Sequence, residues 1–196
     1  MKKIIFFIVS VLLIAGSTNL FSQDKKPERM HPALLVIDIQ KQFMPMMDER
    51  DTAIPMYAIN AYIDLFRKNG FPIIRIYHSD KDYGPFPGTP EFEFPEKVTI
   101  LPDDPKVIKT YGNGFNKTDL EKILRDKGVN TLFLCGLSSV GCVLATYMGA
   151  QDLDFKAFLI KDAMMSHNAD YTNNIEEIFD ALGYDVVNVM LDNAEK

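Results

Sequence analysis

Cysteine, histidine and long basic runs are scarce in this sequence. Its 196 residues include 2 Cys and 3 His. Two cysteines cannot build a disulfide scaffold, and no C-x-x-C pair is present. Three histidines limit any histidine-rich metal site. Lys and Arg number 21 against 27 Asp and Glu, which gives a formal net charge of −6. The chain as a whole therefore repels phosphate, and we predict no nucleic-acid partner.

The sequence contains enough hydrophobic residues to form one hydrophobic core. Hydrophobic residues make up 47% of the chain and charged residues 24%, a balance typical of globular proteins and not of disordered or fibrous ones. The length is that of a single domain. We expect this domain to span residues 33–196.

The N-terminus has the pattern of a secretory signal peptide. A basic start (Met1-Lys2-Lys3) precedes a short apolar run over 4–14 and then small residues. The run is shorter than the roughly 20 apolar residues that span a bilayer. We predict a signal over residues 1–22, cleaved after Ser22 or alternatively after Ser17, with an uncleaved anchor as the other reading.

Cleavage after residue 22 would leave residues 23–32 as a flexible polar lead-in. The mature protein would then be periplasmic or secreted, with no stable membrane span.

Apolar runs alternate with helical patterns along the rest of the chain. This alternation predicts a three-layer α/β/α fold around a mostly parallel, six-stranded, Rossmann-like sheet. The expected strands are 33–39, 71–77, 107–109, 131–134, 155–160 and 184–189. In such sheets ligands bind at the carboxyl ends of the strands, where the strand order reverses. Residues just after strands are therefore the candidates for chemistry.

Cys142 follows a Gly- and Ser-rich turn over 136–141 and begins an expected helix over 142–151. A thiol at a helix N-terminus feels the positive end of the helix dipole, so we predict a lowered pKa and a reactive thiolate. The alternative is a small buried apolar residue, which is the reading that we favour for Cys135, in the middle of a strand.

Two charged residues stand beside apolar strands. Asp38 lies inside an apolar run, where a carboxylate needs a partner and is a candidate general base, or else caps a following turn. Lys109 ends a short strand and would stabilise a nearby thiolate, unless it is an ordinary surface lysine.

Histidines offer a second set of partners. His78 and His167 each follow a strand, and either could pair with Cys142 or contact a substrate. Metal binding at His78 would need Asp80 or Asp82, and without a second histidine nearby we predict no metal and no cofactor.

Together these stretches resemble one known family. LLVIDIQKQF (34–43), VIKTYGNGFNKTDLEKIL (107–124), TLFLCGLSSVGCVLATYMGA (131–150) and IKDAMMSH (160–167) are similar to the isochorismatase-like cysteine hydrolases, which include nicotinamidases and N-carbamoyl amidohydrolases. The resemblance implies hydrolysis of a small amide or ureido compound through a thioester, by a protein that forms homo-oligomers.

The resemblance also implies roles for particular residues. Asp38, Lys109 and Cys142 would form the catalytic triad, and the N–H groups of Ser138 and Cys142 the oxyanion hole. It further implies a cis peptide bond between Leu137 and Ser138.

The sequence departs from the family pattern at three places. Ser139 replaces a usual Thr, and Asp154 stands where a Gly commonly ends a helix. The stretch 77–80 (YHSD) lacks the Asp-x-His metal motif of nicotinamidases, which argues against nicotinamide and a metal.

Five side chains are candidates to shape the substrate pocket: Phe43, Tyr83, Phe86, Phe115 and His167. Two other functions stay open at this point. The chain could be a secreted binding module without activity, or a redox protein that uses Cys135 and Cys142.

Overall fold

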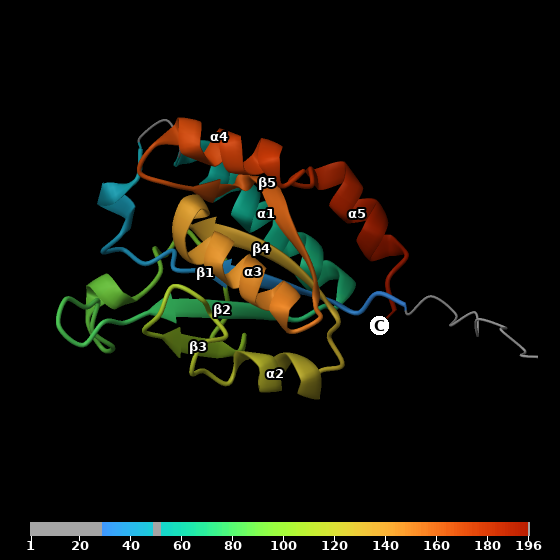
Figure 1. The fold of residues 1–196 in the computed structure, drawn as a ribbon, viewed down its shortest axis with the longest axis horizontal. Helices are drawn as coiled ribbons and strands as arrows, with labels where there is room; N and C mark the ends of the chain where they lie inside the picture. The colour runs from blue at the N-terminus through green and yellow to red at the C-terminus, as the bar shows by residue number, and fades with distance from the viewer. Residues whose placement is uncertain (1–28, 49–51, 196) are drawn as a thin grey trace, which may run out of the picture.

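The computed structural model describes residues 29–48 and 52–195 as an α/β fold on one parallel sheet (Figure 1). The strands lie in the order β3-β2-β1-β4-β5, and every neighbouring pair is parallel. The strands are β1 (Pro32–Ile37), β2 (Ile73–His78), β3 (Lys106–Lys109), β4 (Thr131–Leu137) and β5 (Lys156–Met165). The helices are α1 (Ala53–Asn69), α2 (Leu120–Asp126), α3 (Leu144–Asp152), α4 (Ala169–Ile178) and α5 (Tyr184–Asp192), with short helical turns η1 (Met44–Met46), η3 (Pro90–Phe92) and η4 (Ser139–Val143).

The apolar composition of each strand matches its place in the sheet. β1 and β4 are central and buried along their whole length. Residues on both faces of a central parallel strand meet helices, so such strands are continuous apolar runs. β3 lies at one edge and alternates exposed and buried residues. The predicted mostly parallel α/β architecture is confirmed.

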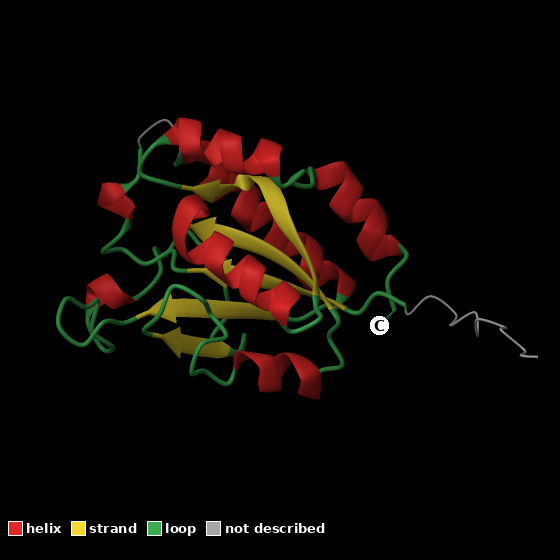
Figure 2. Ribbon diagram, in the orientation of Figure 1, coloured by secondary structure: helices red, strands yellow, loops and turns green. Residues whose placement is uncertain are grey.

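Helices cover both faces of the sheet (Figure 2). One core contains Leu34 and Val36 of β1 with the buried faces of α1 and α5. The other contains Leu35 and Ile37, from the opposite face of β1, with α2 and α3. Alternate side chains of β1 thus point to opposite faces of the sheet, and each face packs against its own layer of helices.

The sheet has five strands rather than the predicted six, because residues 184–189 begin helix α5. Val187 and Leu191, four residues apart, are buried, whereas Val186 and Val189 are exposed. That spacing is helical, and it packs one side of α5 against α1. The expected strand reduces to a single bridge between Leu182 and Ile160 just before α5.

The predicted signal (1–22) and residues 23–28 of the lead-in lie outside the described residues, so export stays a prediction. Within the part of the chain that is described, no helix combines the length and apolar character needed to cross a bilayer.

Candidate active site

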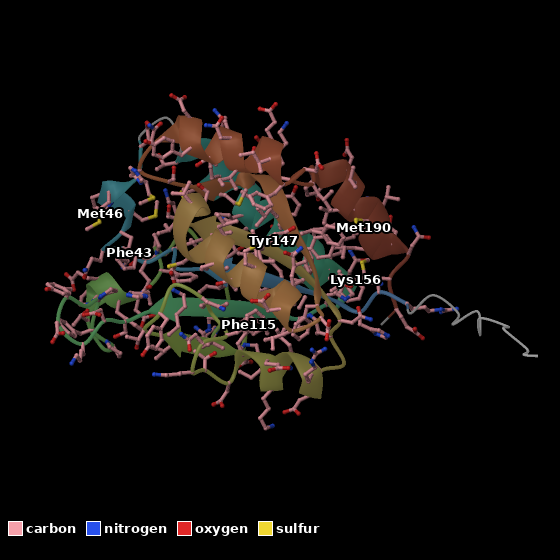
Figure 3. The ribbon with its side chains drawn as sticks, in the orientation of Figure 1. Phe43, Met46, Phe115, Tyr147, Lys156 and Met190 are labelled. Atoms are coloured by element: carbon pink, nitrogen blue, oxygen red, sulfur yellow. The ribbon has the colours of Figure 1, made fainter. Side chains whose placement is uncertain are left out.

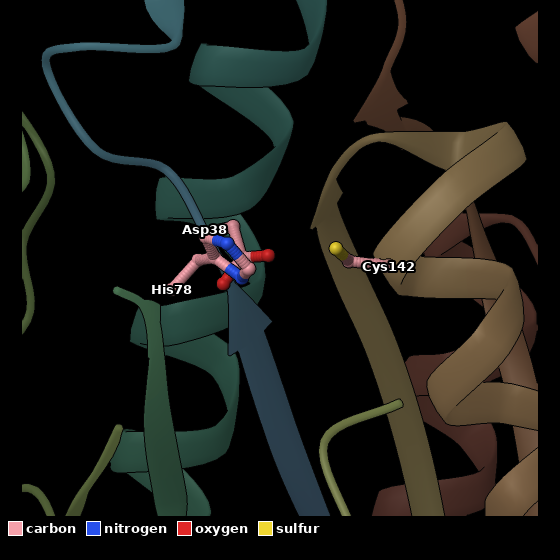
Figure 4. A group of neighbouring side chains, drawn as sticks. All are labelled: Asp38, His78 and Cys142. Carbon is pink, nitrogen blue, oxygen red and sulfur yellow. The ribbon is translucent and has the colours of Figure 1, made fainter. Parts of the chain in front are cut away.

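Four side chains that could take part in acid–base or nucleophilic chemistry meet at the carboxyl edge of the sheet. Asp38 directly follows β1, His78 ends β2, Lys109 ends β3, and Cys142 lies in the turn after β4. The strand order reverses between β1 and β4, so Asp38 and Cys142 flank the switch point where parallel sheets bind ligands. In Figure 4 the sulfur of Cys142 points across this gap toward Asp38 and His78.

Asp38 and Lys109 form a buried ion pair. Lys109 Nζ lies 2.6 Å from Asp38 Oδ2, and their side chains are 0% and 2% exposed. Asp38 has a left-handed backbone (φ 54°), which turns the chain at the end of β1. Burial raises the pKa of Asp38 above its ordinary value, and the ammonium of Lys109 offsets only part of that effect. A carboxylate with a raised pKa is better matched to proton transfer near neutral pH.

Cys142 faces this pair from the other side of the switch point. Ligating atoms of Asp38, His78 and Cys142 all lie within 4.8 Å of one another. Burial, followed by the negative charge of Asp38, raises the pKa of the Cys142 thiol to about 11. The cysteine is thus a protonated thiol at rest, beside a carboxylate that can take its proton.

The predicted lowering of the Cys142 pKa is therefore wrong. Cys142 does not begin α3, which starts at Leu144; it lies in η4, where Gly141 has a non-helical backbone (φ −124°, ψ −109°). The thiol is also largely buried beside a carboxylate, and both surroundings disfavour the thiolate.

The turn before Cys142 is held by close backbone contacts. A Cβ on Gly136 (φ +116°) would come within 2.1 Å of the Ile37 carbonyl oxygen, so only glycine fits there. The peptide bond between Leu137 and Ser138 is cis, as the resemblance implies. The Ser138 carbonyl accepts hydrogen bonds from the N–H groups of Gly141 (2.9 Å) and Val143 (3.2 Å), which closes the turn.

Buried hydroxyls anchor the same turn from behind. Ser139 Oγ lies 3.1 Å from Thr172 Oγ1, and Thr172 donates to Ser166 Oγ at 3.1 Å. All three residues are buried. This chain of hydroxyls ties η4 to α4 and to the end of β5.

Gln40 is a positioning residue whose role the sequence did not reveal. Its buried side chain donates to the carbonyls of His78 and Phe92, both at 3.0 Å, and its Oε1 accepts the His78 N–H at 2.7 Å. Gln40 thereby fixes the loop after β1 against the end of β2. Its place two residues after Asp38, directly beyond the apolar run of β1, was the available signal.

A cavity of about 240 Å³ opens over these groups. It is lined by Asp38, Phe43, Met47, His78, Leu137, Ser138 and Cys142. Among the predicted pocket side chains only Phe43 is in this lining. Met47 and Leu137 were not predicted, because nothing local in the sequence marks which apolar residue faces the cavity.

The structure does not bring the other four predicted pocket residues to the cavity. Tyr83 and Phe86 are exposed on the loop after β2. Phe115 stacks on Phe155, with ring centroids 5.8 Å apart, and His167 is exposed against Tyr171. In Figure 3, Phe43 lies at the carboxyl edge of the sheet beside η1, whereas Phe115 lies toward the face covered by α2.

A cation already occupies the space between the groups that could bind a metal. Asp38, His78 and Cys142 offer three converging ligand atoms. However, Lys109 Nζ lies 2.6 Å from Asp38 Oδ2 and 3.4 Å from His78 Nδ1. Asp80, which with Asp82 was one of two candidate partners for a metal at His78, instead accepts the N–H groups of Asp82 and Tyr83 in a surface turn. The Asp38 carboxylate and the His78 ring are thus already in contact with the Lys109 ammonium.

The second cysteine is remote from this chemistry. Cys135 lies in β4 within the core, and its Sγ donates to the Leu35 carbonyl at 3.5 Å. Burial raises the pKa of its thiol well above the usual range. Both cysteines are free, and the burial of Cys135 disfavours the redox alternative.

Known proteins resemble this chain over most of its described length. Residues 32–189 match the family model of the Isochorismatase domain. An uncharacterized isochorismatase family protein of Bacillus subtilis (strain 168) is 31% identical over 134 residues, covering 67% of this chain and 72% of that protein. A streptothricin hydrolase of Streptomyces noursei is 30% identical over 142 residues, covering 69% of this chain and 50% of that protein. The crystal structure of a pyrazinamidase of Pyrococcus horikoshii in complex with zinc aligns with a TM-score of 0.67 and 29% identity, covering 79% of this chain and 99% of the other.

Proposed function

Since this chain belongs to the isochorismatase family, we propose that it hydrolyses carbon–nitrogen bonds in small amides or ureido compounds, with Cys142 as the nucleophile. The observation that carries the proposal is the meeting of Asp38, Lys109 and Cys142 at the sheet's switch point. A relative named as a hydrolase and a structural neighbour named as an amidase support the reaction class.

The first half of the reaction forms a thioester. Asp38 accepts the thiol proton of Cys142 as the sulfur attacks the amide carbonyl carbon, and the carbon–oxygen double bond opens to an oxyanion. The N–H groups of Ser138 and Cys142 are the proposed donors to that oxygen. When the carbonyl re-forms, the carbon–nitrogen bond breaks, and Asp38 returns the proton to the departing nitrogen.

The second half regenerates the thiol. Asp38, again ionised, takes a proton from water as the water oxygen attacks the thioester carbonyl carbon. The carbon–sulfur bond then breaks, the acid leaves, and the proton goes back to sulfur. The Lys109 amine, 2.6 Å from Asp38 Oδ2, stabilises Asp38 as a carboxylate in each half-reaction.

Replacement of the nucleophile tests this proposal. Cys142→Ala removes the sulfur, so release of ammonia from a panel of small amides should be abolished while the circular dichroism spectrum and thermal unfolding midpoint stay normal. Cys135→Ala is the matched control: it removes a core sulfur and should lower stability but preserve turnover. Near-normal ammonia release by Cys142→Ala would overturn the proposal.

Trapping of the thioester addresses the binding-module alternative. Incubation of the wild-type protein with a hydrolysable amide followed by rapid acid quenching should trap an acyl group on the Cys142 peptide, detected by mass spectrometry. A protein that binds the amide without any acyl adduct or ammonia release would be a binding module.

A further inference from the structure

The three buried hydroxyls behind Cys142 form a chain with a single direction. Ser166 Oγ donates to the Asn168 carbonyl, which can only accept. Because each hydroxyl has one proton to donate, Ser166 accepts from Thr172 at 3.1 Å, and Thr172 accepts from Ser139 at 3.1 Å. The hydroxyl protons therefore all point from the turn η4 toward the N-terminus of α4.

The far end of this chain is fixed at the N-terminus of α4. Asn168 caps the helix, since its side-chain oxygen accepts the Asp170 N–H at 2.9 Å. Asp48 binds the same place: its N–H donates to the Ser166 carbonyl at 3.0 Å, and its Oδ2 accepts the Ala169 N–H at 3.3 Å. These hydrogen bonds give the hydroxyl chain a fixed attachment point.

The near end of the chain is the turn that carries the proposed oxyanion donors. Ser139 directly follows Ser138, and Cys142 lies in the same turn. Ser138 is extended (φ −88°, ψ 141°) and Gly141 is non-helical, so a regular helical ladder does not set the shape of this turn on its own. Ser139 is 0% and Thr172 2% exposed, and hydrogen bonds shielded from water are electrostatically stronger than those in solvent. The chain can therefore restrain the backbone of the turn.

The chemistry of the site makes this restraint important. An N–H that stabilises an oxyanion has to lie about 2.7–3.1 Å from the oxygen that becomes charged. A displacement of about 1 Å, even one caused by a distant substitution, can slow a reaction by about 100-fold.

We propose that the chain Ser139–Thr172–Ser166 holds the oxyanion donors of Ser138 and Cys142 in place, with Thr172 as its central positioning residue. The inference rests on the proposed function, since the oxyanion donors belong to that mechanism. It assigns to α4, which contributes no side chain to the reaction itself, the task of keeping the turn in its reactive shape.

Two probes of Cys142 separate the position of the donors from the reactivity of the sulfur. The ester p-nitrophenyl acetate acylates a thiolate through a tetrahedral oxyanion: the sulfur–carbon bond forms, the ester carbon–oxygen bond breaks, and p-nitrophenolate leaves. Iodoacetamide alkylates the same thiolate by displacing iodide, without an oxyanion. In a Cys135→Ala background, we take the p-nitrophenolate release that Cys142→Ala lacks as the acylation rate. The ratio of acylation to alkylation then reports oxyanion stabilisation, because both rates depend equally on the thiolate population.

Thr172→Val and Thr172→Ser form a matched pair at the centre of the chain. Valine keeps the shape of the side chain and removes the hydroxyl, so the acylation-to-alkylation ratio should fall by about 10- to 100-fold. Serine keeps the hydroxyl and should retain most of the ratio. Ile175→Ala, about one turn further along α4, removes a buried side chain that is not part of the hydroxyl chain. It should lower the thermal midpoint and leave the ratio unchanged.

An unchanged ratio in folded Thr172→Val, or an equal fall in Thr172→Ser or Ile175→Ala, would overturn the inference. If Thr172→Val does not fold, Ser166→Ala removes the next hydroxyl and makes the same test. A wild-type ratio no higher in the folded protein than in urea would also overturn the inference, because the turn would then stabilise no oxyanion. If the ratios behave as expected but no small amide releases ammonia, the proposed function fails and the positioning role of Thr172 stands.

Discussion

Replacing Asp38 by Asn should make Cys142 more reactive toward iodoacetamide while abolishing amide hydrolysis. Asp38 is the nearest negative charge to the thiol and raises its pKa, whereas Lys109 lowers it. Asn removes the carboxylate charge and leaves the Lys109 ammonium facing the sulfur without a counterion. The thiolate is then stabilised, but the carboxylate proposed to carry the proton to the leaving nitrogen is gone.

The size of the effect follows from the pKa values. A thiol of pKa about 11 is ionised to about one part in 10,000 at pH 7. An opposite charge nearby lowers a pKa by about 1–3, so the thiolate population at pH 7 should rise about 10- to 1,000-fold. The rate of carboxamidomethylation at Cys142, followed by mass spectrometry in excess iodoacetamide, should rise by a similar factor.

Two controls separate this effect from partial unfolding. Breaking a buried ion pair costs about 3–5 kcal/mol, so circular dichroism must first show that Asp38→Asn is folded under the assay conditions. The double variant Asp38→Asn/Lys109→Met removes both charges, and its alkylation rate should fall below that of the single variant. Slower alkylation in folded Asp38→Asn than in wild type would refute the reasoning, since it would mean that Asp38 activates the thiol as a base even toward iodoacetamide.

Three further outcomes follow from the fold and the site. Because burial raises the Asp38 pKa, hydrolysis needs a pH above that raised value. The acid limb of the pH profile of kcat/KM should therefore have an apparent pKa above that of an ordinary aspartate, and activity should be lost as the pH falls through it. Gly136→Ala should prevent soluble expression, since its Cβ would overlap the Ile37 carbonyl; normal yield and folding would contradict this. Leu191→Ala should lower the free energy of unfolding in urea by about 2–5 kcal/mol, because its side chain is on the buried side of α5. Val189→Ala, on the exposed side of the same helix, should change little, and equal losses would refute the packing of α5.

The layout of the candidate triad could be predicted because it depends on topology alone. Asp38, Lys109 and Cys142 each stand at or just after the end of an apolar strand, and parallel strands end at one edge of the sheet. No knowledge of side-chain packing was needed to place them together. Their catalytic roles, the export of the chain and its assembly into oligomers stay predictions.

The wrong predictions, which concern the sixth strand, the pocket residues and the Cys142 pKa, share a different cause. The run 184–189 is short and apolar, and such runs fit a strand or a buried helix equally until a packing partner is known. The loop carrying Tyr83 is likewise held by a distant residue, because the Gln42 side chain donates to the Tyr83 carbonyl. The Cys142 pKa depends on burial and on Asp38, more than 100 positions away in the sequence, and a local motif at residues 136–142 cannot report either.

The distance from β3 to β1 explains why the third member of the cluster is a lysine. Neighbouring strands lie about 4.8 Å apart, so a side chain at the end of β3 must reach across β2, a span of about 10 Å, to contact a residue after β1. Lys109 is paired in register with His78 and passes its ring, at 3.4 Å from Nδ1, before reaching Asp38 at 2.6 Å. A shorter cation would stop at β2 and leave Asp38 buried without a counterion. The reach of the four-carbon stem thus lets Asp38 stay charged beside the thiol while the space in front of Cys142 is left for substrate.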